Sequence, residues 1–134
     1  MYIWQMIRGQ TTMKILLCAS IIFAATCAQA QGAGFPDDAT VPSADAIQQH
    51  LNGNAFDIKL ADGSSWHVQY GKSGDYEFKS SKGFADHGDW KAEDGKICSK
   101  GTKIPYSCSD VKMKGDLMYL KRDNGEVVQF VQQQ

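Results

Sequence analysis

Several features that would identify a function are missing from this sequence of 134 residues. Lys and Arg do not outnumber Asp and Glu, at 14 against 15 residues, which excludes a generally basic nucleic-acid binder. The longest apolar run has eleven residues, fewer than the roughly 20 that a membrane-spanning helix needs. The length suits a single domain and excludes both a two-domain enzyme and a barrel of alternating strands and helices.

Sequence motifs of catalysis are equally scarce. The chain has no Gly-x-Ser-x-Gly nucleophile elbow, no phosphate-binding loop, no His-Glu-x-x-His metal motif and no redox Cys-x-x-Cys pair. The three histidines are scattered, so we expect neither a metal ion nor a cofactor. The chain is not predicted to be disordered, because 43% of its residues are hydrophobic and only 22% are charged.

The first thirty residues predict a secretory signal peptide. Lys14 precedes an apolar run over residues 15–25, and Ala28-Gln29-Ala30 has the small residues of a cleavage site. Translation could start at Met1 or at Met13, since the segment from Met13 is already complete. A lipid anchor on Cys27 is a weaker alternative, because Thr26 suits lipidation poorly and no Leu lies three residues before Cys27.

Cleavage after Ala30 leaves two of the four cysteines, Cys98 and Cys108. Exported proteins fold in an oxidising compartment, where two cysteines are expected to pair. The nine residues between them suit a hairpin loop. We therefore predict a structural disulfide that joins two antiparallel strands at the base of this loop.

Residues 31–42 contain two of the three prolines and predict a flexible leader before a single domain over residues 43–134. Ser43 is suited to cap a helix over residues 44–51, and Asn52-Gly53 to end it. Only Ala44, Ile47 and Leu51 form its apolar face, so the helix must pack against the rest of the domain.

After the helix, apolar residues recur at every second position in short runs separated by turns such as Asp62-Gly63, Asp94-Gly95 and Asn124-Gly125. The runs cover residues 56–60, 66–70, 76–79, 90–92, 97–98, 108–113, 117–120 and 127–131, with a looser stretch over 80–89. This pattern is typical of antiparallel strands with one wet and one buried face. The predicted fold is mainly β, a meander of about eight strands closed as a small barrel or packed as a sandwich.

His87 lies in the densest group of ligand-type side chains, between Asp86 and Asp89. These residues could form the acid–base pair of a small hydrolase. The spacing matches no metal motif, however, and Asp, His and Gly are ordinary loop residues. We therefore expect no catalytic site and keep the hydrolase as an alternative.

Aromatic residues are concentrated in the middle strands, notably Trp66, Tyr76 and Trp90. They either form the core or line a cavity for a small apolar ligand, since ligand pockets are mostly apolar with a few polar groups. Trp66, Tyr76 and Trp90, together with His87, are our candidates for ligand binding.

The pattern Gly88-Asp89-Trp90, Gly95-Lys96-Ile97-Cys98 and, ten residues later, Cys108 resembles small exported bacterial proteins of the DUF995-like type. The resemblance covers roughly residues 53–131. It implies the architecture of an exported β domain and nothing about catalysis, since these proteins have no established activity.

Ser73-Gly74-Asp75-Tyr76 and Tyr106-Ser107-Cys108 are similar to the Ser-Gly-x-x-Tyr loop and Tyr-x-Cys strand of periplasmic lysozyme inhibitors. The two segments occur here in the reverse order along the chain. The similarity implies that Ser73 and Tyr76 enter the cleft of a target enzyme.

Together these features predict an exported, non-catalytic binding protein of the cell envelope. Its partner is either an unknown protein or a small apolar ligand, and we expect neither nucleic acid nor stable membrane insertion of the mature chain. The alternatives are an inhibitor or immunity-type protein that blocks an envelope hydrolase, and the small hydrolase that uses His87.

Overall fold

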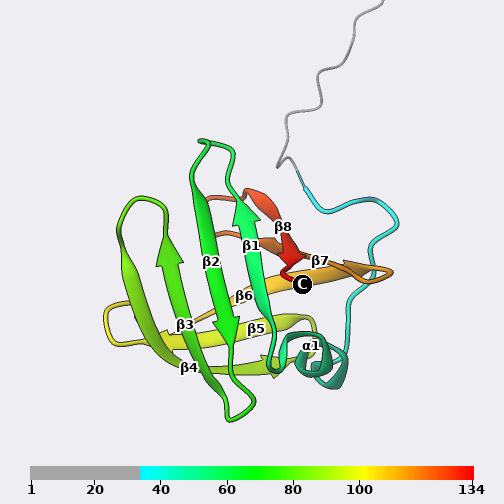
Figure 1. Cartoon of the computed structure of the whole chain (residues 1–134). Helices are drawn as coiled ribbons and strands as arrows, with labels where there is room; N and C mark the ends of the chain where they lie inside the picture. Colours follow the sequence, from blue (N-terminus) through cyan, green and yellow to red (C-terminus); the bar gives the residue numbers. More distant parts are fainter. Residues whose placement is uncertain (1–33) are drawn as a thin grey trace, which may run out of the picture.

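Eight antiparallel strands close into a barrel in a computed structural model that describes residues 34–134 (Figure 1). The predicted signal peptide, Cys27 and the first residues of the predicted leader lie outside the described residues. In chain order the strands are β1 (Ala55–Lys59), β2 (Ser65–Tyr70), β3 (Asp75–Ser80), β4 (Ala85–Glu93), β5 (Lys96–Gly101), β6 (Ser107–Lys114), β7 (Leu117–Lys121) and β8 (Val127–Gln132).

Each strand pairs with its neighbour in sequence, and β1 pairs with β8 to close the barrel. The closing register is short and joins Phe56 to Gln132 and Asp57 to Val131. The prediction of a mainly antiparallel β fold with eight strands is confirmed. Because the sheet closes on itself, the fold is a barrel and not a sandwich. The loose stretch over residues 80–89 turned out to contain the first half of β4, which begins at Ala85.

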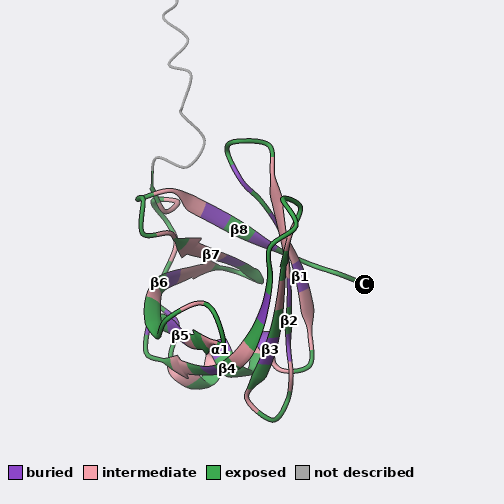
Figure 2. Cartoon of the chain, turned by 90° about the vertical axis from the view of Figure 1, so that its left-hand side faces the viewer, coloured by how far each residue is buried: buried purple, intermediate pink, exposed green. Residues whose placement is uncertain are grey.

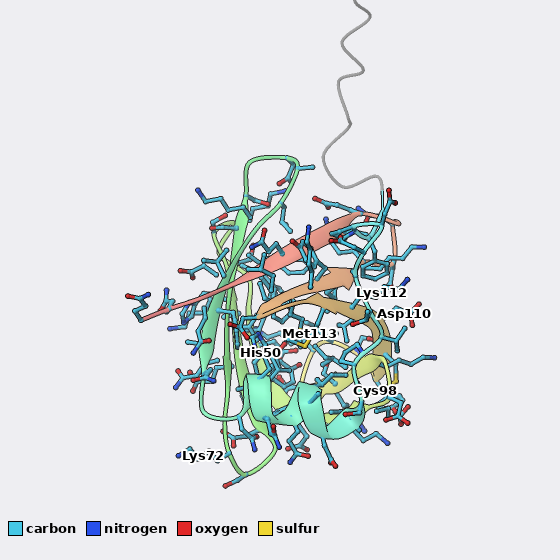
Figure 3. The ribbon with its side chains drawn as sticks, turned by 90° about the vertical axis from the view of Figure 1, so that its right-hand side faces the viewer. His50, Lys72, Cys98, Asp110, Lys112 and Met113 are labelled. Atoms are coloured by element: carbon cyan, nitrogen blue, oxygen red, sulfur yellow. A yellow bond between two sulfur atoms is a disulfide. The ribbon has the colours of Figure 1, made fainter. Side chains whose placement is uncertain are left out.

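Helix α1 (Ala44–Leu51) forms where the sequence predicts it. The Ser43 hydroxyl accepts a hydrogen bond from the Ala46 amide at 3.1 Å, so it caps the first turn. Ile47 and Leu51 are fully buried, while the His50 ring packs at 5.4 Å on Phe56 (Figure 3). Helix α1 therefore covers one end of the barrel, the end that also carries Lys72 in the turn between β2 and β3.

The inner faces of the strands supply the core, as the alternation predicts (Figure 2). Phe56, Ile58, Val111, Met118 and Phe130 are among its buried side chains. The opposite end of the barrel from α1 is formed by the connections over residues 60–64, 81–84, 102–106 and 122–126 (Figure 1). One end of the barrel is thus covered by a helix, and the other end only by turns and loops.

The described part of the predicted leader is tied to the barrel. Thr40 and Met113 exchange two backbone hydrogen bonds of 2.8 Å, and Pro42 accepts one from Gly95. Gly95 has a positive φ of 70°, and a Cβ there would lie 2.7 Å from Val41. Contacts to the barrel thus begin upstream of Ser43.

The predicted disulfide between Cys98 and Cys108 is present. The two residues lie directly opposite each other on β5 and β6. The bond therefore joins two adjacent strands of the barrel wall at the base of the loop over residues 102–106.

Candidate functional site

A cavity of about 380 Å³ lies inside the barrel and reaches its open end. An eight-stranded barrel is just wide enough either to be filled by its own side chains or to hold one small ligand. Here the side chains near α1 fill the lumen, and those near the loops do not. The apolar lining consists of Ile58, Trp66, Val68, Tyr70, Tyr76, Phe78, Ile97, Ile104, Leu120 and Phe130.

Aromatic rings form one wall of this cavity. Trp66 meets Phe78 edge to face at 5.4 Å, because the two residues alternate inward on adjacent strands β2 and β3. Deeper in the barrel, Tyr70 stacks against Phe130 with the ring centroids 6.5 Å apart. Such contacts hold the rings in fixed orientations, so this wall is pre-formed.

The opposite wall is small and polar. Ser99 on β5 and Ser109 on β6 both point inward, by alternation with Ile97 and Val111. Short side chains at these positions leave the space that a larger residue would occupy. The cavity is therefore asymmetric, with rings on one side and hydroxyl groups on the other.

Tyr76 is 5% exposed, and its hydroxyl has no hydrogen-bond partner among the described residues. Burial and the negative charge of Asp86 raise the pKa of Tyr76, while the nearby Ser99 hydroxyl lowers it by less. The phenol therefore stays protonated, beside the Ser99 hydroxyl. A buried polar group without a partner is unusual and calls for an explanation.

The mouth of the cavity carries Arg122. Its guanidinium pairs with Glu126 and lies 4.7 Å from the centroid of the Trp66 ring. Glu126 also accepts a 2.7 Å hydrogen bond from the Ala61 amide, a contact that lowers the pKa of Glu126. Arg122 is thus held between a carboxylate and an aromatic ring and links β7–β8 to β1–β2.

Asp86 organises the loop beside the mouth. Its carboxylate is 6% exposed and accepts hydrogen bonds from the amides of His87, Thr102, Lys103 and Ile104 and from the Thr102 hydroxyl. Burial raises the pKa of Asp86, but these hydrogen bonds together outweigh burial and hold the pKa well below its usual range. The loop positions Ile104 on the cavity lining.

The sequence-predicted candidates do not form one site. Trp66 and Tyr76 line the cavity, whereas Trp90 is buried near the covered end, where its indole donates to the Gly71 carbonyl at 3.3 Å. Ser73 is exposed in the turn between β2 and β3, at the end of the barrel away from the mouth. Because Tyr76 points into the barrel, it cannot enter a target's cleft together with Ser73 as the similarity to lysozyme inhibitors implies.

His87 lies exposed on the outer face of β4, opposite Glu77 on β3. Asp86, the next residue, points to the inner side, so the two side chains lie on opposite faces of the strand. Asp89 shares the outer face with His87 and lies opposite Asp75. His87 and Asp89 are both open to solvent outside the lumen cavity, and His87 lines a separate surface pocket together with Glu77, Lys79 and Lys103.

One group within residues 34–134 brings together three side chains of metal-ligand type, namely Glu93, Cys98 and Cys108. Its two sulfur atoms form the disulfide, so they offer no thiolate to a metal ion.

Sequence reasoning missed Arg122, Ser99 and Ser109 as cavity residues. The alternation of each strand could have identified all three residues, because inward-facing positions recur at every second residue. Arg122 continues the inward series of Met118 and Leu120 past the end of β7. Serine and arginine are polar, so an apolar alternation does not mark them as inward-facing positions.

In the part of the chain that the structure describes, no helix is both long and apolar enough to cross a membrane. Comparisons of the chain with protein-family models, curated proteins and solved structures found no match.

Proposed function

We propose that this protein is an exported, non-catalytic binding protein that holds a small apolar molecule in the barrel lumen. The observation that carries the proposal is the cavity of about 380 Å³ at the open end of the barrel. Its volume falls in the range of small-molecule pockets, and its lining has their usual character, mostly apolar with a few polar groups.

The lining suits binding better than catalysis. Among the described residues that line the cavity, none is a histidine or a cysteine, and Asp123 at the mouth is the only carboxylate. Nucleophilic or acid–base catalysis needs a reactive side chain within hydrogen-bond reach of a partner. Aromatic rings and scattered hydroxyl groups supply affinity and orientation instead.

Export is part of the proposal and rests on two features. The sequence over residues 1–30 has the parts of a signal peptide. The Cys98–Cys108 disulfide suits an oxidising compartment such as a periplasm or the extracellular space.

Titration with the neutral apolar fluorophore phenylnaphthylamine tests the lumen directly. We expect saturable binding of one molecule per chain, with enhanced and blue-shifted emission. Ser109→Leu should abolish this binding, because the new side chain fills the cavity from the inner face of β6. Ser73→Leu, a matched change on an exposed turn at the other end, should leave it unchanged.

The unfolding free energies of the same two variants distinguish an open cavity from a filled core. In a tightly packed core, a larger side chain at position 109 costs about 1–3 kcal/mol of unfolding free energy. In an open cavity it is tolerated or stabilising. A strongly destabilised Ser109→Leu variant, or unaltered dye binding by it, would count against the lumen as a ligand site.

A further inference from the structure

Most charged side chains around the open end of the barrel are neutralised in pairs. Lys82 pairs with Asp62 at 2.7 Å, and Arg122 pairs with Glu126 on the rim of the cavity. Asp123 also lines the cavity, is exposed to solvent and forms no ion pair within the described part of the chain. Among the described residues of the cavity lining, Asp123 is therefore the one charged group without a counter-charge.

A second negative charge lies behind the cavity wall. The buried Asp86 carboxylate accepts hydrogen bonds from uncharged donors, namely backbone amides and the Thr102 hydroxyl. A Cβ built on Gly101 would lie 2.0 Å from this carboxylate and 2.8 Å from the hydroxyl of Tyr76, a residue of the cavity lining. Because no ion pair within residues 34–134 neutralises Asp86, its charge makes the potential in the lumen more negative.

The remaining basic side chain of the loops at this end does not line the lumen. Lys103 donates a hydrogen bond to the Ala85 carbonyl at 2.9 Å, and its ammonium lies 5.4 Å from the centroid of the Phe84 ring. Lys103 borders the separate surface pocket that also contains His87. An anionic group of a ligand in the lumen would thus meet the field of two carboxylates and find no unpaired cation among the described lining residues.

The aromatic wall also favours a positive charge. The face of an aromatic ring carries partial negative charge and attracts ammonium and guanidinium groups. One such contact is already present at the mouth, because the Arg122 guanidinium lies 4.7 Å from the centroid of the Trp66 ring. Trp66 and Phe78 line the cavity and are only half-buried, so both rings are accessible from the lumen.

We infer that the ligand is an apolar molecule with one cationic group, such as an ammonium, whose apolar body lies in the lumen and whose charge lies at the mouth beside Asp123. At the mouth the ammonium keeps part of its hydration, which avoids the large cost of burying a charge. The apolar body is removed from water against the aromatic wall. This inference rests on the proposed function, since it names the class of molecule held in the same lumen.

Three competitors with the same naphthylmethyl body test the inference by displacement of phenylnaphthylamine. The cation carries a trimethylammonium group, the neutral reference carries a tert-butyl group of the same shape, and the anion carries a sulfonate group. We expect the cation to displace the dye at a concentration about tenfold below that of the anion, as one weak ion pair and one cation–π contact together predict. Raising the salt concentration from about 0.01 M to about 1 M should reduce this difference, because salt screens an exposed carboxylate.

Asp123→Asn assigns the preference to the unpaired carboxylate. The substitution keeps the shape of the side chain and removes its charge, so the melting temperature should not change. We expect the affinity for the cation to fall about threefold and the affinity for the neutral reference to stay the same. Asp116→Asn is the matched control, since Asp116 is exposed in the turn between β6 and β7, away from the mouth, and should leave all three affinities unchanged.

The two proposals fail in different ways. If the wild-type protein does not bind phenylnaphthylamine, the lumen is not a ligand site and the proposed function is wrong. If the dye binds but the anion competes as well as the cation, or Asp123→Asn leaves the affinity for the cation unchanged, the inference about a cationic group is wrong and the binding function stands.

Discussion

Gly88 and Gly101 face each other across β4 and β5, and neither position has room for a methyl group. A Cβ on Gly88 would lie 2.0 Å from the Lys100 carbonyl oxygen, and one on Gly101 would meet Asp86 and Tyr76. Glycines inside strands mark places where another backbone approaches closely. This close approach brings the loop anchor, Asp86, next to the buried hydroxyl of Tyr76.

The close contacts of Gly88 and Gly101 predict how strongly alanine at each position lowers the stability of the protein. Gly88→Ala should cost about 3 kcal/mol or more of unfolding free energy, because the obstructing atoms belong to the backbone. Gly101→Ala should cost about 2–3 kcal/mol, because the obstructing Asp86 carboxylate belongs to a side chain but can shift only by weakening its hydrogen bonds to the loop. Gly34→Ala, where a Cβ meets nothing within 4 Å, is the control and should be neutral in urea unfolding. Equal stability of all three variants would contradict the close approach.

The disulfide should contribute a large share of the stability. In the chain-entropy model, closing a loop with a sequence separation of 10 is worth about 2.5–3 kcal/mol. Cys98→Ala with Cys108→Ala should lose this amount in guanidinium unfolding under oxidising conditions. Alanine is the better replacement, because Cys98 is fully buried and serine would bury a hydroxyl. Reductant should destabilise the wild-type protein and leave the double variant unaffected.

Asp86→Asn should loosen the loop beside the cavity mouth. The new amide group presents its own donors to the backbone N–H groups of Thr102 and Ile104, which now bond to the carboxylate. We expect faster amide hydrogen exchange over residues 102–104 and a lower melting temperature. Asp110→Asn, an exposed change on β6, serves as the control. Unchanged exchange in the Asp86 variant would mean that the loop does not depend on this anchor.

The same carboxylate predicts part of the acid sensitivity. The pKa of Asp86 in the folded protein lies below the value of about 3.9 for an unfolded aspartate. Its stabilising contribution is therefore complete above about pH 3.9 and is lost as the pH falls through the folded-state pKa. Urea midpoints measured between about pH 5 and pH 2 should fall less steeply for Asp86→Asn than for the wild-type protein. A slope identical to that of the wild-type protein would contradict the assignment.

Arg122→Met should open the mouth of the barrel. The change removes the guanidinium that lies over the Trp66 ring and leaves the Glu126 carboxylate, whose side chain is 13% exposed, without its cation. We expect a loss of about 1–2 kcal/mol, below the cost at a fully buried pair because the Arg122 side chain is 26% exposed. Trp66 should become more accessible to acrylamide quenching. Lys121→Met, on the neighbouring exposed position, should change neither quantity.

The sequence by itself determined the local features of this protein. Ser43 and Asn52-Gly53 bound the helix through capping chemistry, and Asp-Gly and Asn-Gly turns separate strands whose faces follow a period of two. The pairing of Cys98 with Cys108 followed from their count and spacing. Such features depend on contacts between residues close together in the chain, so they can be predicted from the sequence without knowledge of the tertiary structure.

Only the tertiary structure decided which inward residues surround empty space. Trp66 and Trp90 have the same alternation, yet one borders the cavity and the other is buried near the end that α1 covers, because they lie at different heights along the barrel. Closure depends on the pairing of β1 with β8, about 75 residues apart, which no local pattern specifies. The approach of Asp86, Tyr76 and Gly101 depends on the registers of three neighbouring strands, because Gly88 on β4 lies opposite both Tyr76 on β3 and Gly101 on β5. Which of these side chains meet is therefore set by strand pairing in space and not by spacing along the chain.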